Sequence, residues 1–114
     1  MTAIPEIDLA RIARWCEARV PPQVRDQVRI EFTTRGSSVN VLERRAPFAP
    51  DRDPAWTSTR IAQLRHDAGS NGWSLYFRDR NDVVHDYRDA APVGTRLIDV
   101  LAELDADPTA IFWG

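Results

Sequence analysis

Histidine and aspartate are the side chains of this sequence that could carry acid–base or metal chemistry. The chain has two histidines, His66 and His85, and the second is flanked at short range by Asp79 and Asp86. Histidine titrates near neutral pH and supplies most general bases and many metal ligands in proteins. One hypothesis is therefore a small enzyme in which His85 or His66 acts as the base beside Asp86 or Asp79.

The expected strand pairing argues against that hypothesis. Residues 79–81 (Asp-Arg-Asn) predict a three-residue hairpin turn, which would set Leu75 opposite His85. Both histidines would then lie on the interior side of the sheet, on the order of 11 Å apart with Trp73 between them. We therefore expect His85 to be a hydrogen-bonded core histidine, His66 to lie nearer a strand end where it could be exposed, and no metal site.

Other catalytic signatures are missing from the sequence. Cys16 is the single cysteine and falls on the predicted buried face of a helix, where a nucleophilic role is not expected. The sequence has no Gly-x-Ser-x-Gly elbow, phosphate-binding loop or dinucleotide fingerprint. We therefore assign no catalytic residue and no cofactor.

Arginine placement is more informative. All fifteen basic residues are arginine, and Arg11, Arg14 and Trp15 share the outer face of a predicted helix. Tryptophan flanked by arginine is typical of interfaces, although Trp15 could equally fold over the rim of the core beside a solvated charged face. The last predicted helix carries the opposite charge, on Asp99, Glu103, Asp105 and Asp107. The leading hypothesis is a non-catalytic interaction or regulatory module that binds a protein partner, most simply as a homodimer through Arg11, Arg14 and Trp15.

A nucleic-acid-binding accessory protein is a second hypothesis. Its support is the same helical arginines, which could bind phosphates, together with Arg44, Arg45, Arg78 and Arg80. The formal net charge of −2 argues against a bulk nucleic-acid binder, which usually has a basic excess.

Two helices and five strands are expected to position these residues. Apolar spacing predicts a first helix over 5–20 with Asp8 as its N-cap, and alternation predicts strands over 27–34, 39–45, 59–66, 73–78 and 83–88. A second helix over 96–105 would begin at the N-cap Thr95 and bury Leu97, Ile98, Leu101 and Leu104. The order α-β-β-β-β-β-α predicts a single α+β domain over 1–114, a five-stranded antiparallel sheet with both helices packed on one face.

The composition predicts a cytoplasmic protein. Its apolar and charged fractions are those of an average globular chain, and the N-terminal residues show no apolar signal-peptide core. No apolar run approaches the roughly 18–20 residues that a transmembrane helix needs, so a membrane partner is not expected.

The sequence resembles an uncharacterised bacterial family, domain of unknown function 3024. The similarity rests on the motifs Pro54-Ala-Trp56-Thr57, Trp73-Ser-Leu75-Tyr76, Asp79-Arg80-Asn81, His85-Asp-Tyr87 and Asp107-Pro108-Thr109-Ala-Ile111-Phe112-Trp113-Gly114. Ala110 stands where the family pattern leads us to expect glycine, and Val84 where it leads us to expect an aromatic residue. The resemblance implies a stand-alone bacterial domain and transfers no catalytic residue.

Overall fold

The computed structural model describes residues 4–49, 51–52, 54–87 and 92–113 and has the predicted order of elements. Helix α1 (Glu6–Ala18) leads through a short 3-10 turn η1 (Pro22–Val24) into the strands. The strands are β1 (Val28–Arg35), β2 (Ser38–Arg45), β3 (Thr57–Asp67), β4 (Gly72–Arg78) and β5 (Val84–Asp86), and helix α2 (Leu97–Ala106) follows. The α+β class and the element order predicted from the sequence are confirmed.

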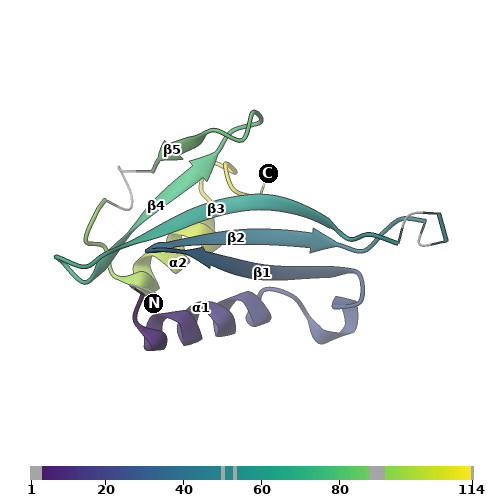
Figure 1. The fold of residues 1–114 in the computed structure, drawn as a ribbon, viewed down its shortest axis with the longest axis horizontal. Coiled ribbons are helices and arrows are strands. Elements are labelled where there is room, and N and C mark those ends of the chain that lie inside the picture. The colour runs from purple at the N-terminus through teal and green to yellow at the C-terminus, as the bar shows by residue number, and fades with distance from the viewer. Residues whose placement is uncertain (1–3, 50, 53, 88–91, 114) are drawn as a thin grey trace.

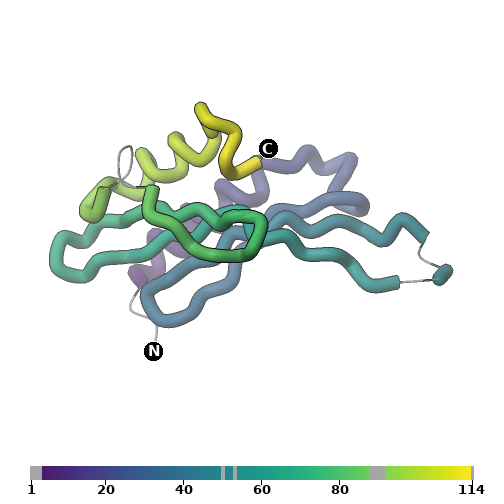
Figure 2. The backbone as a smooth tube through the Cα atoms, turned by 90° about the horizontal axis from the view of Figure 1, so that it is seen from above, coloured from purple at the N-terminus to yellow at the C-terminus, as the bar shows by residue number. Residues whose placement is uncertain are grey.

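The five strands form one antiparallel sheet in which each strand pairs with its neighbours in sequence, in the order β1-β2-β3-β4-β5 (Figure 1). The β2–β3 pairing contains one irregularity, next to Val41 and Leu42. In Figure 1 α2 lies behind the sheet and α1 runs below β1, and the view from above shows α2 on the far side of the strands from the viewer of Figure 1 (Figure 2). The buried residues of both helices belong to one core with the same strand side chains. One face of the sheet is therefore covered and the other has no helix on it.

The core fills the space between the sheet and the helices. Alternate strand residues supply one side of it, and Val39, Leu64 and Leu75 are at most 1% exposed. Ile12 and Leu104, from α1 and α2, are fully buried on the other side. The two-residue period of the strands therefore explains which face the helices cover, because only that face is apolar.

The helix ends differ from the sequence prediction. The N-cap of α1 is Pro5, and Asp8 lies inside the first turn, where its carboxylate accepts a 3.0 Å hydrogen bond from Trp73 Nε1. The N-cap of α2 is Arg96, while Thr95 pairs with Trp73 in an isolated β-bridge. Both predicted caps were wrong, because each residue bonds to β4 instead of to its own helix.

The buried stripe of α2 is also rotated slightly from the prediction. Leu97, Leu101 and Leu104 are buried as expected, but Ile98 is 67% exposed and Val100 takes its place in the core. On α1, Ile12 and Cys16 are buried, whereas Ala13 is exposed.

The register of the β4–β5 hairpin differs from the predicted one. His85 lies opposite Phe77, not opposite Leu75. The Asp79 N–H donates to the Val83 carbonyl, and Asp82, with φ of 62°, is the residue in the left-handed region. The turn therefore falls one residue later than predicted, which shifts the pairing by two residues and keeps each side chain on its predicted face.

The last strand lies close to where the sequence predicts it, and the C-terminal tail contacts the core. The strand predicted over 83–88 is shorter in the structure, where β5 covers Val84–Asp86, and position 88 lies outside the described residues. Near the other end, Phe112 is buried and Trp113 Nε1 donates to the Leu104 carbonyl at 2.8 Å. These two aromatic residues dock the apolar tail on the core. Within the described residues, neither helix has both the length and the apolarity required to cross a bilayer.

Candidate functional site

Trp15, predicted as an exposed contact residue, joins the two helices to each other. Its Nε1 donates to Asp105 on α2 at 3.0 Å, and Arg19 NH1 donates to the same carboxylate at 2.7 Å. Its ring centroid lies 6.3 Å from that of Trp113. Of the two interpretations that the sequence left open for Trp15, the structure shows the one in which the side chain folds over the rim of the core.

The acidic residues of the last helix are each bonded within the chain. Asp99 pairs with Arg96, Glu103 accepts from the Tyr87 hydroxyl at 2.8 Å, and Asp105 holds Trp15. The Asp107 carboxylate accepts the N–H groups of the following tail. Asp105 thus bonds to Trp15 and Arg19, and the other three acidic side chains bond to groups elsewhere in the chain, which weakens the argument from opposite charges for self-association. A homodimer stays a prediction.

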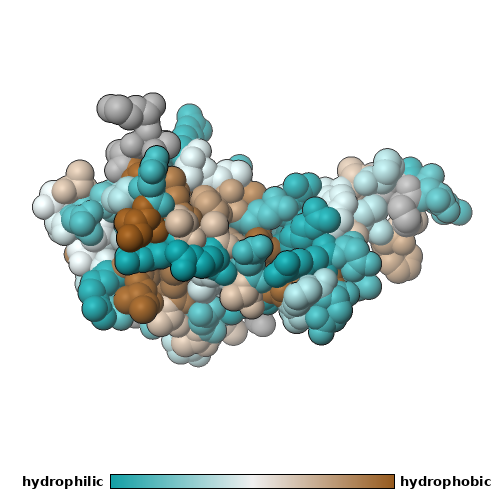
Figure 3. All heavy atoms as spheres, turned by 90° about the horizontal axis from the view of Figure 1, so that it is seen from below, coloured by the Kyte–Doolittle hydropathy of each residue, from teal (hydrophilic) through white to brown (hydrophobic). Residues whose placement is uncertain are grey.

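A hollow of about 600 Å³ lies between α1, α2 and the start of β4, and we call it the helix groove. Its lining combines apolar side chains, arginines, one carboxylate and one amide. These residues are Trp73, Leu97, Ile98 and Leu101, then Arg11, Arg14 and Arg96, then Asp8 and Asn71. Figure 3 looks at the α1 side of the molecule and shows apolar atoms gathered at one end of it, with hydrophilic atoms running between them. A pocket with an apolar wall and a few polar groups has the general character of a ligand site.

Positive charge dominates the helix groove. Arg11, Arg14 and Arg96 line it together with one carboxylate, Asp8. Asp8 is buried and already accepts a hydrogen bond from Trp73, and its contact with Arg11 is long at 3.5 Å. Arg14 is exposed and pairs with no carboxylate among the described residues. The groove can therefore offer guanidinium groups to an anion next to an apolar surface.

His66 is buried, although the sequence suggested that it could be exposed. It is 9% exposed, its Nε2 lies 3.1 Å from Asn71 Oδ1, and its ring meets Trp73 edge-on at 5.2 Å. Asn71 and Trp73 line the helix groove, whereas His66 does not. The residue therefore supports the wall of the groove from behind.

His85 is exposed, so the expectation of a core histidine was wrong. The ring stacks on Phe77 at 5.0 Å, and Nε2 lies 2.8 Å from Asp79 Oδ2. The physical reason is that β5 is an edge strand beyond the cover of the helices, so its interior-facing side chains reach water. Asp86, the next residue, points to the opposite face of the sheet.

The Asp79–His85 pair is the one His/Asp arrangement that the structure assembles from the predicted polar site. Asp79 also accepts hydrogen bonds from the backbone N–H groups of Asn81 and Val83. The bond to His85 and these two bonds hold the pKa of the Asp79 carboxyl below the usual range. Such bonds are typical of an aspartate that closes a turn. Among the described residues, no group of three or more His, Cys, Asp and Glu side chains could hold a metal ion. The pair therefore has a sufficient structural role in the hairpin.

Cys16 is buried between α1 and the sheet, as expected. Removal from water and the nearby Glu31 carboxylate raise the pKa of the thiol to about 12. The thiolate is the reactive form of cysteine, so this side chain is inert at neutral pH.

Two charged residues of the helix groove were not predicted as site residues. Arg96 was assigned only to a helix end, and Asp8 only to a cap. The signal that could have found them is the position of each in the first turn of its helix, next to an exposed isoleucine, Ile98 or Ile7. That signal becomes useful only when the two helix starts are known to be neighbours.

The fold and the groove define a small α+β module in which two helices on one face of a meander enclose an arginine-lined hollow. The chain belongs to the family described as Domain of unknown function (DUF3024), which matches residues 1–114. No curated protein matches the chain, and no solved structure does so either.

Proposed function

We propose that the chain is a non-catalytic cytoplasmic interaction module whose helix groove binds a segment of a partner protein. The segment would carry apolar side chains next to carboxylates. The observation that supports this proposal is the meeting of Arg11 and Arg14 with an apolar wall in one hollow.

The apolar wall would supply the burial that a peptide needs. Leu97, Leu101 and Trp73 are at most 8% exposed and form its base, while Ile98 stands 67% exposed at the side. An exposed isoleucine beside a hollow gives a bound apolar side chain a second surface to contact. Burial of such surface is the main favourable term in most protein associations.

The arginines would select acidic partners. The planar guanidinium group matches a carboxylate with two parallel hydrogen bonds, and bonds between charged groups are stronger than neutral ones. Arg11 has a 56% exposed side chain, and its ion pair with Asp8 is a long hydrogen bond of 3.5 Å. Both α1 arginines are therefore available to a ligand at little cost to the fold.

A peptide titration tests the proposal. The probe is a short fluorescein-labelled peptide of leucine and glutamate, compared with the matching leucine and glutamine peptide. Binding is followed by fluorescence polarisation and mapped by amide chemical shifts in ¹⁵N-labelled protein. We expect shifts around the helix groove and an affinity roughly tenfold higher for the glutamate peptide.

Charge-neutral variants locate the site. Arg11→Gln with Arg14→Gln should weaken glutamate-peptide binding about tenfold or more, because two charge-assisted hydrogen bonds are lost. Arg52→Gln with Arg80→Gln removes the same charge away from the groove and should leave binding nearly unchanged. Equal affinity for both peptides, or equal loss in both variants, would refute the proposal.

Sedimentation separates a foreign partner from a second copy. If the free chain is a dimer that Arg11→Gln and Arg14→Gln dissociate, a second copy occupies the groove and the proposal of a foreign segment is wrong. A monomer that still binds the peptide supports it.

A further inference from the structure

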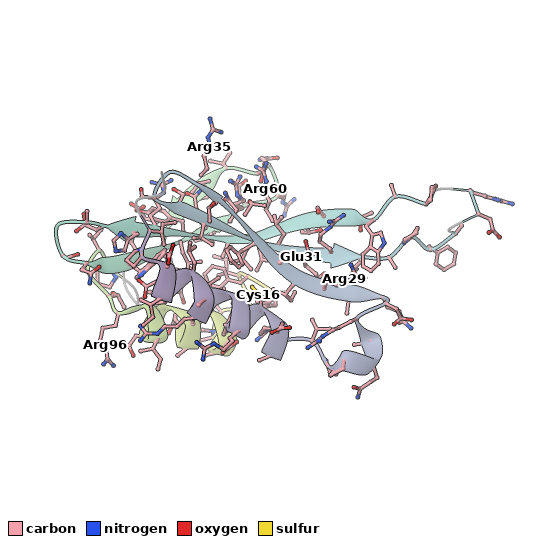
Figure 4. All side chains as sticks on the ribbon, turned by 60° about the horizontal axis from the view of Figure 1, so that its bottom comes forward. Cys16, Arg29, Glu31, Arg35, Arg60 and Arg96 are labelled. Atoms are coloured by element: carbon pink, nitrogen blue, oxygen red, sulfur yellow. The ribbon has the colours of Figure 1, made fainter. Side chains whose placement is uncertain are left out.

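The face of the sheet opposite the helices is open and rich in arginine. Strand alternation places on it the side chains that point away from the buried Val39, Leu64 and Leu75. We call it the helix-free face, and its arginines are Arg29, Arg35, Arg44, Arg60, Arg65 and Arg78. Figure 4 shows Arg35 and Arg60 pointing away from the helices.

The positive charge of this face is not balanced locally. Strand alternation gives the face three carboxylates, Glu31, Asp67 and Asp86, against six arginines, whereas the whole chain has more acidic than basic residues. Asp82 in the β4–β5 turn pairs with both Arg60 and Arg78, so one carboxylate serves two guanidinium groups. Six of the fifteen arginines are therefore gathered on one face of a molecule with a net negative charge.

Three of the six arginines are free of such pairing. Within the residues that the structure describes, no carboxylate pairs with Arg29, Arg35 or Arg65. Arg35 and Arg65 flank Ser38 at one end of the face, and Arg29 lies near the start of β1 at the other end. A surplus of positive charge in this arrangement is complementary to an extended polyanion.

Aromatic rings hold two of the guanidinium groups in place. Arg65 lies 4.0 Å over the Tyr76 ring and donates to Gln63, and Arg29 lies 4.4 Å over the Trp56 ring. An arginine that is already fixed loses less conformational entropy when it binds. Each stacked pair presents a flat, charged platform on which a base can lie.

Uncharged polar side chains fill the space between the arginines. Thr33, Asn40, Gln63 and Tyr76 form one row across four strands, and Asn40 bonds to Gln63 at 3.1 Å. Amide and hydroxyl groups can donate to and accept from base edges. In duplexes these edges lie inside grooves that a broad sheet does not enter, whereas a single strand exposes them.

We propose that the helix-free face binds single-stranded nucleic acid, with arginines on the phosphates and the arginine–aromatic pairs under the bases. This surface lies on the other side of the sheet from the helix groove, and the proposal does not depend on the function assigned to that groove. A single chain could then bind a protein segment and a nucleic-acid strand at once.

Fluorescence anisotropy with labelled oligo(dT) and oligo(U) at low salt tests the proposal. We expect saturable binding that weakens as salt rises, because bound phosphates release counterions. Binding of either strand supports the proposal, and a preference between them distinguishes DNA from RNA as the natural ligand. Absence of binding to both strands at low salt would overturn it.

Paired variants connect binding to this face. Arg35→Gln with Arg65→Gln should weaken binding about tenfold and lower the salt slope by about one to two, since two phosphate contacts are lost. Arg45→Gln with Arg52→Gln removes the same charge from other parts of the chain and should change the affinity less than about twofold. Equal weakening by the two pairs would show general electrostatic attraction and refute the assignment of the face.

Competition decides between polyanions. An unlabelled duplex, and vesicles that contain phosphatidylserine, should displace the labelled strand much less effectively than unlabelled oligo(U). Competition by either one as strong as that of the single strand would overturn the proposal. Thermal unfolding of each variant confirms that the loss of binding does not reflect loss of the fold.

Discussion

The two faces of the sheet differ in what their side chains are used for. The helix-covered face contributes Val39, Leu64 and Leu75 to the core, whereas the helix-free face carries arginine, threonine, asparagine and glutamine. The same strands supply both sets of residues by alternation, which is interrupted once in β3, where the consecutive residues Ile61 and Ala62 are both buried. Residues that stabilise the fold and residues available for recognition can therefore alternate within one short strand, because neighbouring side chains point to opposite faces of the sheet.

The helix groove adds a third environment at the edge of the covered face. There the helices leave part of the apolar wall open, and Arg11 and Arg14 stand beside it. Charges on the two sides of the sheet therefore have different neighbours: apolar side chains in the groove, and polar and aromatic ones on the helix-free face. This difference is why we assign a peptide to one and a nucleic-acid strand to the other.

The sharpest test of the two-face comparison uses adjacent residues of β3. Leu64→Ala should lower the free energy of unfolding by about 2–5 kcal/mol, because a fully buried side chain leaves a cavity. Gln63→Ala, one residue earlier and on the other face, should change it by about 0.5 kcal/mol or less. Urea unfolding measures both, and similar losses in the two variants would contradict the assignment of faces.

The histidines define where the covered face ends. Both lie on that face by register, but His66 is buried against Trp73 while His85 is exposed on β5. His66→Ala should cost about 1–3 kcal/mol of unfolding free energy, since it leaves a space beside the buried Trp73 and removes the hydrogen bond to Asn71. His85→Ala should cost about 0.5 kcal/mol, as expected for an exposed pair. Thermal or urea unfolding measures both losses of unfolding free energy, and a larger loss for His85→Ala than for His66→Ala would contradict the prediction.

The sequence predicted the elements and faces of this fold because those signals are local. Alternation along β1 to β4 and the apolar spacing of α1 are each contained in a few consecutive residues. The hairpin register was missed because Asn81 and Asp82 both tolerate positive φ, and a turn shifted by one residue leaves the pattern of faces unchanged.

The candidate site was only partly predictable for a different reason. Arg11 and Arg14 were found from helical spacing, and both line the groove. The contact that Trp15 makes within its own chain was not predicted, because its partner Asp105 is ninety residues away in sequence. No local pattern states which two helices meet, and the contact decides whether a tryptophan binds a partner or its own chain.

The smallest expected effect concerns acid stability at the exposed end of β5. Bonds from His85 and the Val83 N–H lower the pKa of the Asp79 carboxyl in the folded chain. A carboxyl with a lowered pKa stabilises the fold above its unfolded value of about 3.9, and that contribution is lost as pH falls through the lower folded value. Asp79→Asn should therefore lower the unfolding temperature slightly at pH 6, and the difference from the unmodified chain should shrink below about pH 4.

Asp67 offers an independent check on that behaviour at the opposite end of β4. Hydrogen bonds from the Ser70 hydroxyl and N–H lower the pKa of this carboxyl too, so Asp67→Asn should show the same narrowing in acid. Unfolding temperatures measured from pH 6 to about pH 2.5 decide the question. A difference that stays constant over this range would mean that Asp67 stabilises its turn by shape alone, without a contribution from the lowered pKa of its carboxyl.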